Sequence, residues 1–359
     1  MSANLNPETV MAALQEVMVP GTKVDIVKVG LIGEIKVTGA EVVVSVVRTS
    51  EKEETISKVR SGVMEAVSHL PGVMTVKVPV DDRSVPKAAP RGPHGQSIDP
   101  FADRAKLPGV EKIIAVASAK GGVGKSSVAV NLALSLAAQG LRVGLMDADV
   151  YGPSVPTMLG LQEKPEVTDD RKIHPVVCRG LQVISMGLLM PPEQPVIWRG
   201  PLVFSALKQF LKDVMWSDLD FLVVDMPPGT GDAQLTLIQQ VPLSGVVMVT
   251  TPQEVALADV RRGINMFRET KVPVLGVVEN MSYFLCPDNG KKYDIFGTGG
   301  GAEVAKQYNL PLLAEIPIDP AIRIGGDIGE PAALVDGSAA QAAFLALAKK
   351  VSELAVDAE

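Results

Sequence analysis

Residues 113–127 read Ile113-Ile114-Ala115-Val116-Ala117-Ser118-Ala119-Lys120-Gly121-Gly122-Val123-Gly124-Lys125-Ser126-Ser127, an apolar run followed by a glycine-rich loop. A segment with the apolar periodicity of a helix begins at Ser127. Strand, loop and helix in this order predict a phosphate-binding loop, or P-loop. Glycines lack β-carbons, so successive backbone N–H groups face a polyphosphate above the positive end of the helix. The predicted nucleotide-binding residues here are Ala119, Lys120, Gly121, Gly122, Val123, Gly124, Lys125, Ser126 and Ser127.

Two side chains of this loop have predicted chemical roles. Lys125 neutralises the β- and γ-phosphates, and the Ser126 hydroxyl binds Mg²⁺. The alternative is a glycine turn that merely joins a strand to a helix, but the Gly-Lys-Ser ending and both flanks favour a P-loop. The loop departs from the general pattern at its start, where Ala119 replaces the first glycine and a second lysine, Lys120, follows.

Carboxylates end two further predicted strands. The strand over 142–146 leads to Asp147-Ala148-Asp149, and the strand over 220–225 ends at Asp225. Ligands of open α/β sheets gather at the carboxyl ends of the strands. We therefore expect Asp147 and Asp149 near the γ-phosphate, although acids at a strand end also cap helices, and Asp225 at Mg²⁺ through water.

Two later stretches each have a functional and a purely structural interpretation. Asn280 follows the buried strand over 274–278, where a purine edge needs a side chain that both donates and accepts hydrogen bonds. An Asn in that place also caps turns. The stretch Gly297-Thr298-Gly299-Gly300-Gly301 lacks the Lys-Ser ending of a P-loop, so we expect a flexible turn ahead of a helix over 302–308.

The order of strands and helices predicts an α/β protein of two domains. Strand and helix alternate from residue 109 onward, which indicates a P-loop NTPase with a mostly parallel sheet flanked by helices. Residues 1–80 predict a small α/β adaptor domain that carries no catalytic constellation, and the five prolines of 81–108 indicate a linker. The predicted division is therefore 1–80, 81–108 and 109–359.

Composition narrows the class of protein. The net charge of −7 and the absence of a basic run argue against a nucleic-acid binder. With only two cysteines a disulfide framework is excluded, and no signal peptide or apolar run of transmembrane length is visible. We expect a cytoplasmic protein with no membrane partner. Three histidines argue against a histidine-rich metal site.

The loop over Lys120–Ser126 resembles the deviant P-loop of the MinD/ParA/nitrogenase-iron-protein class of ATPases, with Lys120 at the signature-lysine position. Within that class the chain is most similar to the Mrp (ApbC) branch of iron–sulfur cluster carrier ATPases. The N-terminal unit resembles the domain often fused ahead of these ATPases. The strings that carry the resemblance are Asp147–Pro156, Trp198–Pro201, Asp225–Asp232, Glu279–Phe284 and Asp294–Gly297.

The resemblance implies a homodimer that closes around two ATP molecules, with Lys120 reaching the partner's phosphates. It implies that Asp149 positions or activates the attacking water, that Asp225 supports Mg²⁺ and that Asn280 reads adenine. The catalytic residues would then be Lys120, Lys125 and Asp149. The implied partners are iron–sulfur client or assembly proteins.

The sequence departs from its family at the cluster site. The usual carrier has two cysteines separated by two residues, but here the second position is Asn289 and only Cys286 remains. Two thiolates per dimer are too few for an ordinary four-cysteine cluster. Three alternatives stay open: a cluster completed by other thiols or a client's cysteines, a nucleotide-switched adaptor that holds no cluster, and Cys286 as a small buried residue. DNA partitioning of the ParA type is disfavoured by the charge.

Overall fold

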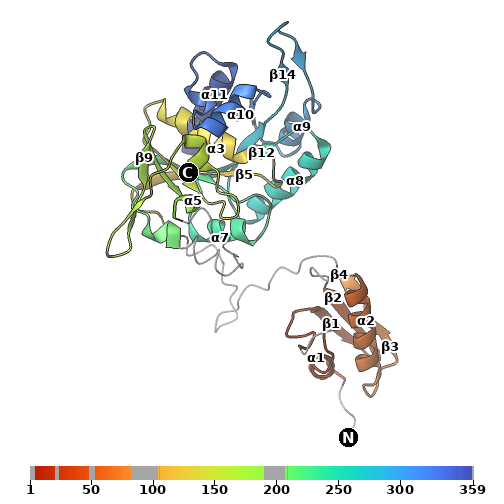
Figure 1. The fold of residues 1–359 in the computed structure, drawn as a ribbon. Helices are drawn as coiled ribbons and strands as arrows, with labels where there is room; N and C mark the ends of the chain where they lie inside the picture. The colour runs from red at the N-terminus through yellow and green to blue at the C-terminus, as the bar shows by residue number, and fades with distance from the viewer. Residues whose placement is uncertain are drawn as a thin grey trace. The chain divides into compact units, whose positions relative to one another are not determined.

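The structure is a computed structural model that describes most of the chain. The chain divides into two compact units, Met1–Ile98 and Asp99–Glu359 (Figure 1). Nearly all of the predicted linker and the string Trp198–Pro201 lie outside the described residues. The described residues are 5–20, 24–47, 53–81, 104, 106–189, 207 and 209–357.

The first unit packs two helices on one face of a small sheet. Asn6 caps the first helix, because its side chain accepts a hydrogen bond from the Thr9 backbone N–H at 2.9 Å. Alternate valines of the second strand are fully buried against apolar side chains of the second helix, so this unit has a hydrophobic core of its own. Its elements are α1 (Pro7–Leu14), β1 (Ile32–Thr38), β2 (Glu41–Val47), α2 (Glu53–Ser68), β3 (Thr75–Lys77) and β4 (Val80–Asp81).

The second unit is built on an eight-stranded sheet in the order β16-β13-β12-β5-β11-β6-β10-β9. All neighbouring pairs are parallel except β9 and β10, which are antiparallel. The predicted mostly parallel sheet is therefore confirmed, with an antiparallel strand at one edge. Its strands are β5 (Val110–Ala117), β6 (Val143–Asp147), β9 (Val176–Cys178), β10 (Leu181–Ser185), β11 (Leu219–Asp225), β12 (Gly245–Thr250), β13 (Val274–Glu279) and β16 (Leu312–Glu315).

Helices cover both faces of this sheet (Figure 1). One core cluster joins the sheet to α3 (Lys125–Ala137) and α11 (Ala339–Asp357), and the other joins it to α7 (Asp232–Gln240) and α8 (Glu254–Glu269). The remaining elements are α4 (Val155–Leu159), β7 (Glu166–Val167), β8 (Ile173–His174), α5 (Met186–Leu189), β14 (Phe284–Leu285), β15 (Lys292–Tyr293), α9 (Gly300–Gln307), α10 (Pro320–Ile328) and the 3-10 helix η1 (Ala332–Leu334).

The register of the central strands explains where polar side chains collect. Asp225 at the end of β11 lies opposite Asp147 at the end of β6 and opposite Val116 near the end of β5. The glycine-rich loop leaves β5 at that same edge. The strand ends therefore deliver two carboxylates to the loop that the sequence predicts to hold phosphate.

Candidate functional site: a P-loop at the carboxyl edge of the sheet

The predicted strand, loop and helix are present. The helix begins at Lys125, two residues earlier than predicted, and Gly124 precedes it with a φ of 81°. That left-handed conformation suits glycine, which has no β-carbon to clash. The loop borders a cavity of about 220 Å³. Its lining includes Gly121, Gly122, Gly124, Lys125, Ser126, Ser127, Asp149, Ser154 and Pro228.

Lys125 joins the loop to two carboxylates. Its ammonium Nζ lies 2.5 Å from Asp225 Oδ1 and 3.9 Å from Asp149 Oδ2, and it donates to Ser126 Oγ at 3.2 Å. The lysine side chain is 6% exposed. The positive charge is thus held inside the site, next to the loop N–H groups, where a phosphate needs it.

Asp225 is fully buried behind this lysine. Burial raises the pKa of its carboxyl, an effect that the Lys125 ammonium opposes. Its second oxygen, Oδ2, has no hydrogen-bond partner among the described residues. A buried acceptor without a donor is costly unless a ligand supplies one, and water on a Mg²⁺ ion is such a donor.

The two acids at and just after the end of β6, Asp147 and Asp149, differ in their surroundings. Asp147 accepts hydrogen bonds from the backbone N–H groups of Ser154 and Val155 at 3.1 and 3.2 Å, so it caps the start of α4. Burial raises the pKa of Asp147 to about 7, and the nearby charge of Asp225 adds to the shift. Asp149 instead faces Lys125 at the P-loop cavity.

Asn280 lies beside the loop, at the end of β13. Its side-chain Nδ2 donates to the Val123 backbone oxygen at 2.8 Å, so it holds the loop in place. A β-carbon at Gly124 would stand 2.2 Å from that nitrogen, which explains the glycine. Asn280 also lines a second cavity of about 720 Å³, which shares Gly124 and Ser127 with the P-loop cavity.

Backbone groups of Lys120 and Gly229 are both hydrogen-bonded to Ser118. Lys120 is exposed, and among the described residues it forms no ion pair. Its backbone oxygen accepts from Ser118 Oγ at 2.9 Å, which fixes the loop and leaves the ammonium free to extend outward. Gly229, which follows two prolines after Asp225, donates its N–H to Ser118 O at 2.9 Å. The Gly229 N–H therefore already has a hydrogen-bond partner within the chain.

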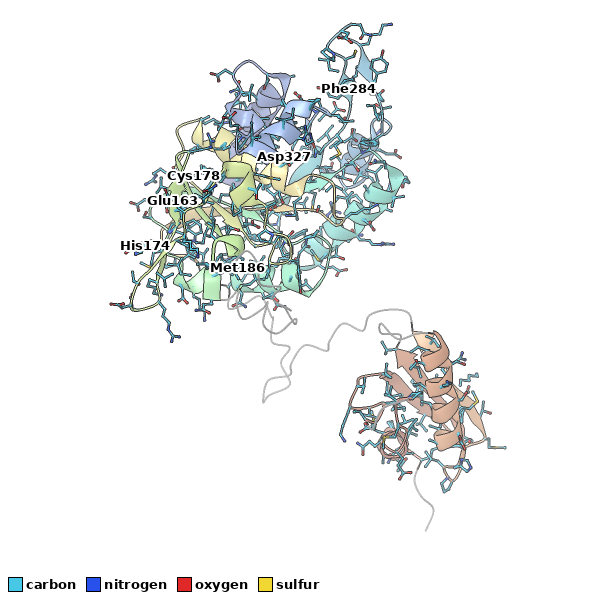
Figure 2. All side chains as sticks on the ribbon, in the orientation of Figure 1. Glu163, His174, Cys178, Met186, Phe284 and Asp327 are labelled. Carbon is cyan, nitrogen blue, oxygen red and sulfur yellow. The ribbon has the colours of Figure 1, made fainter. Side chains whose placement is uncertain are left out.

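The thiols are held apart within the subunit. Cys286 is half-buried in the turn between β14 and β15, and Asn289 is exposed in the same turn, where its Oδ1 accepts from the Lys291 N–H at 2.9 Å. Cys178 ends the edge strand β9, and Figure 2 shows it far across the unit from Phe284 on β14. Burial raises the pKa of the Cys178 thiol. The structure brings no second cysteine to Cys286.

One functional arrangement escapes the sequence patterns. Glu279, the fully buried last residue of β13, accepts hydrogen bonds from Ser282 Oγ at 2.6 Å and from the Gly301 N–H at 2.5 Å. The Gly299–Gly301 stretch, expected as a flexible turn, is instead the anchored start of α9. A β-carbon at Gly300 would meet Leu257 at 2.4 Å, so close packing requires these glycines. The sequence signal that could have indicated this arrangement is Glu279 itself, an acidic residue directly before Asn280.

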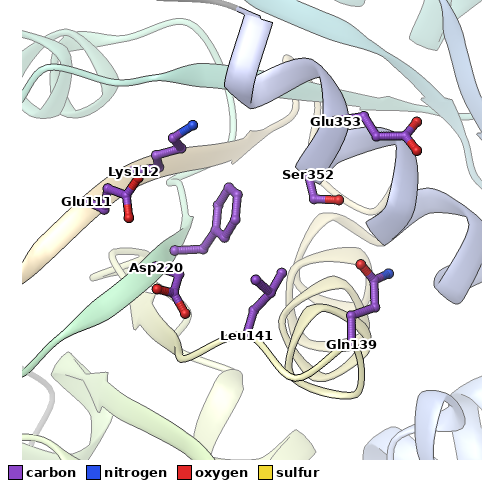
Figure 3. A pocket seen from close by; sticks show the side chains of 8 residues that line it. Glu111, Lys112, Gln139, Leu141, Asp220, Ser352 and Glu353 are labelled. Atoms are coloured by element: carbon purple, nitrogen blue, oxygen red, sulfur yellow. The ribbon is translucent and has the colours of Figure 1, made fainter.

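A separate cavity of about 450 Å³ opens at the opposite, amino edge of the sheet (Figure 3). Lys112 is buried there and donates to the Ala355 backbone oxygen at 3.3 Å. The other lining residues are Glu111, Gln139, Leu141, Asp220, Phe221, Ser352 and Glu353. This cavity lies at the other end of the strands from the P-loop and takes no part in that site.

Two kinds of feature are absent from the described residues. No group of three or more His, Cys, Asp and Glu side chains in these ranges is arranged to hold a metal ion. Among the helices of the described ranges, none is long and apolar enough to cross a membrane.

The sheet, the loop and its acids define a P-loop NTPase of the MinD and ParA fold. The sequence model of the NUBPL iron-transfer P-loop NTPases matches residues 109–352, and that of an iron–sulfur cluster assembly protein domain matches residues 7–78. The chain belongs to the NUBPL iron-transfer P-loop NTPase family. The resemblance to iron–sulfur cluster carrier ATPases is thereby confirmed.

Known proteins resemble the chain over most of its length. A relative from Aquifex aeolicus named "Iron-sulfur cluster carrier protein" is 47% identical over 335 residues, which cover 90% of this chain and 91% of the relative. A nucleotide-binding protein from Archaeoglobus fulgidus, solved in complex with ADP, is 40% identical with a TM-score of 0.58 and covers 67% of this chain and 94% of its own. MinD from Pyrococcus horikoshii, solved with Mg-ADP, shares the fold at 23% identity, with a TM-score of 0.53 and coverage of 69% and 98%.

Proposed function

We propose that the chain is an ATP-binding and ATP-hydrolysing carrier that delivers iron–sulfur clusters to apoproteins. The observation that carries the proposal is the buried Lys125–Asp225 pair at the P-loop cavity, in a unit that also presents the Cys286 hairpin. The name of the Aquifex relative supports the cargo, and the ADP in the Archaeoglobus relative supports the nucleotide. The free thiols Cys178 and Cys286 fit a reducing compartment, the cytoplasm.

The nucleotide site uses the residues that line the two joined cavities. Loop N–H groups and Lys125 bind the phosphates, and Asn280 reads adenine from the larger cavity. Ser126 and Asp225 would hold Mg²⁺, the aspartate through water, since the unpartnered Asp225 Oδ2 can accept a hydrogen bond from a metal-bound water. When bound, Mg²⁺ neutralises charge on the β- and γ-phosphates. Asp149 orients the attacking water, since it faces Lys125 across the phosphate cavity.

Two copies of the chain act together. Lys120 is exposed at the mouth of the P-loop, so it extends toward a second copy and contacts that copy's phosphates. A lysine supplied in this way adds positive charge where negative charge develops during phosphoryl transfer. Hydrolysis then depends on the association of two subunits, as expected of a homodimer that closes around two ATP molecules.

The cargo site differs from a four-cysteine cluster site. At the hairpin each subunit presents one thiol, Cys286, so a dimer presents two there. The cysteines of a client apoprotein, or free thiols, complete the coordination of the cluster. Where a client supplies the other ligands, the cluster is more easily passed on, because those ligands already belong to the acceptor.

Anaerobic reconstitution with iron and sulfide tests the cargo. In the presence of a client peptide that carries two cysteines, we expect a visible absorption band in the wild type that is lost in Cys286→Ser. Cys178→Ser is the matched control, since Cys178 lies on the far edge of the sheet and should leave the band unchanged. A band of equal strength in Cys286→Ser would contradict the proposal.

A nucleotide-switched adaptor that holds no cluster is the second candidate. Asn289 in the position of the second cysteine favours it. In this case ATP controls the binding of a client by the N-terminal unit, and Cys286 has no ligand role. Absence of any chromophore in the wild type, together with ATP-dependent retention of a client, would favour the adaptor.

A further inference from the structure

The hairpin that carries Cys286 begins on the wall of the larger cavity. The Ile318 N–H donates to the Tyr283 backbone oxygen at 2.6 Å, and Phe284 forms a parallel bridge with Ile318. Residues 317–319 line the larger cavity on one side and a smaller cavity of about 390 Å³ beside Cys286 on the other. The first strand of the hairpin, β14, thus pairs with residues that line both cavities.

The hairpin also ends on that cavity. β15 stops at Tyr293, and Ile295 and Phe296, two and three residues further on, line the larger cavity. These two apolar side chains are 56% and 39% exposed. Binding is favoured when a ligand covers apolar surface of this kind, because the surface is removed from water.

The larger cavity has the chemistry of a nucleoside site. Its apolar lining includes Met158, Met281 and Ile322, and its polar groups include Asn280 and Asp319. Mostly apolar walls with a few polar groups suit a flat base that needs both stacking and edge hydrogen bonds. The cavity meets the P-loop at Gly124 and Ser127, so a bound nucleotide would place its base here.

The segment between the hairpin and α9 is anchored to a buried carboxylate at its α9 end. Glu279 holds the Gly301 N–H, and Gly297 and Gly299 precede that anchor with φ of 99° and 75°. Both glycines lie between the anchored helix and Phe296, where left-handed backbone allows a change of direction. A shift of Phe296 is therefore passed toward the hairpin, because the helix on the other side is held by a buried carboxylate.

We infer that Ile295 and Phe296 pack against the nucleobase of ATP, and that this contact couples nucleotide binding to the position of the Cys286 hairpin. The inference rests on the proposed binding of ATP. A ligand shifts a conformation only by its differential contacts with the two states. Phe296 supplies that difference. The base covers its side chain in one conformation of the hairpin, whereas in the other conformation solvent covers it.

The test measures two quantities in the full-length protein with Cys178→Ser, so that Cys286 is the one thiol. The first is the affinity for ATP in the presence of Mg²⁺, and the second is the rate at which a disulfide reagent modifies Cys286 with and without ATP. We expect ATP to change the rate by about threefold or more, in keeping with ordinary coupling between sites. In Phe296→Ala the affinity should fall about tenfold. At saturating ATP the change in thiol rate should then be lost.

Tyr293→Ala is the matched control, an aromatic residue of similar exposure, 45%, three positions earlier and outside both cavity linings. It should keep the affinity and the ATP-dependent change. Ile295→Ala is a second, independent variant that should weaken ATP by about threefold. If the parent protein binds ATP but Phe296→Ala and Ile295→Ala bind it equally well, or if ATP leaves the thiol rate unchanged, the inference is wrong. Failure of the parent protein to bind ATP would instead overturn the proposed function.

Discussion

The Lys125 ammonium lies 2.5 Å from the Asp225 carboxylate, and the two side chains are 6% and 0% exposed. The lysine begins α3 and the aspartate ends β11, so the pair fastens the P-loop to the neighbouring strand. Each charge has the other as its main compensation inside the protein. A γ-phosphate and Mg²⁺ would provide new partners for both, which makes the pair responsive to nucleotide.

Removing the lysine should therefore destabilise the fold as well as abolish nucleotide binding. We expect Lys125→Ala to lower the free energy of unfolding by about 3 kcal/mol at pH 8, because it strands a buried carboxylate. Asp225→Asn in the same chain should recover more than half of this loss, since the stranded charge is then gone. Urea unfolding followed by the fluorescence of the buried Trp216 measures both effects. Arg142→Ala, which breaks the exposed Arg142–Asp220 pair, is the control and should cost far less. Equal losses of unfolding free energy in Lys125→Ala and Arg142→Ala would contradict the prediction.

Lys120→Ala should separate binding from turnover. The side chain is exposed, so its loss should leave ATP affinity within about twofold while turnover falls at least about a hundredfold. Lys164→Ala, another exposed lysine away from the loop, should behave as wild type. Normal turnover in Lys120→Ala would exclude a role across the dimer.

Mixing two inactive variants tests the direction of that lysine. A mixed dimer of Lys120→Ala and Asp149→Asn subunits contains one site with both native residues if Lys120 acts on its partner. An equal mixture should then regain about a quarter of the wild-type turnover, because half of the dimers are mixed and each has one intact site. No recovery would indicate that Lys120 acts within its own subunit.

Gly124→Ala should be more damaging than Gly121→Ala in the same loop. Gly124 has a φ of 81°, and a β-carbon there would stand 2.2 Å from Asn280 Nδ2, whereas a β-carbon at Gly121 meets nothing within 4 Å. We expect the first change to lower the free energy of unfolding by about 1–3 kcal/mol and the second to leave it nearly unchanged. Thermal unfolding without nucleotide compares the two, and equal midpoints would refute this account of Gly124.

The sequence was informative where chemistry follows a short pattern. The P-loop, the strands that lead to Asp149 and Asp225, and the mostly parallel sheet all follow from local composition and order. The bond between Asn280 and Val123 does not, because it joins residues far apart in the chain and depends on strand order. The anchoring of Gly301 by Glu279 was missed for the same reason, since a glycine run reads as a turn until a buried acceptor is found beside it. Asp147 and Asp149 were indistinguishable in sequence, and only the course of the chain into α4 separates their roles.

Asp147 predicts a pH dependence of stability whose sign is fixed by its surroundings. Burial, with the charge of Asp225, raises its pKa from 3.8 to about 7, against the hydrogen bonds from Ser185 and the backbone. The folded chain therefore holds this proton more tightly than the unfolded chain. The contribution of this proton to the free energy of unfolding is complete below pH 4 and declines as the pH rises to 7. Above pH 7 the free energy of unfolding no longer changes on account of Asp147.

Asp147→Asn removes this titration. Relative to wild type, the variant should gain in free energy of unfolding as the pH rises from 5 to 7, and the difference should level off by pH 8. Urea unfolding of nucleotide-free, Mg²⁺-free protein at several pH values gives the difference directly. Asp220→Asn is the matched control, because the hydrogen bond from the Arg142 side chain lowers the pKa of Asp220 from its usual value, the opposite direction to the shift of Asp147. The control should therefore differ from wild type by a constant amount over pH 5–8. If Asp147→Asn runs parallel to wild type over the same range, burial does not hold a proton on this carboxyl.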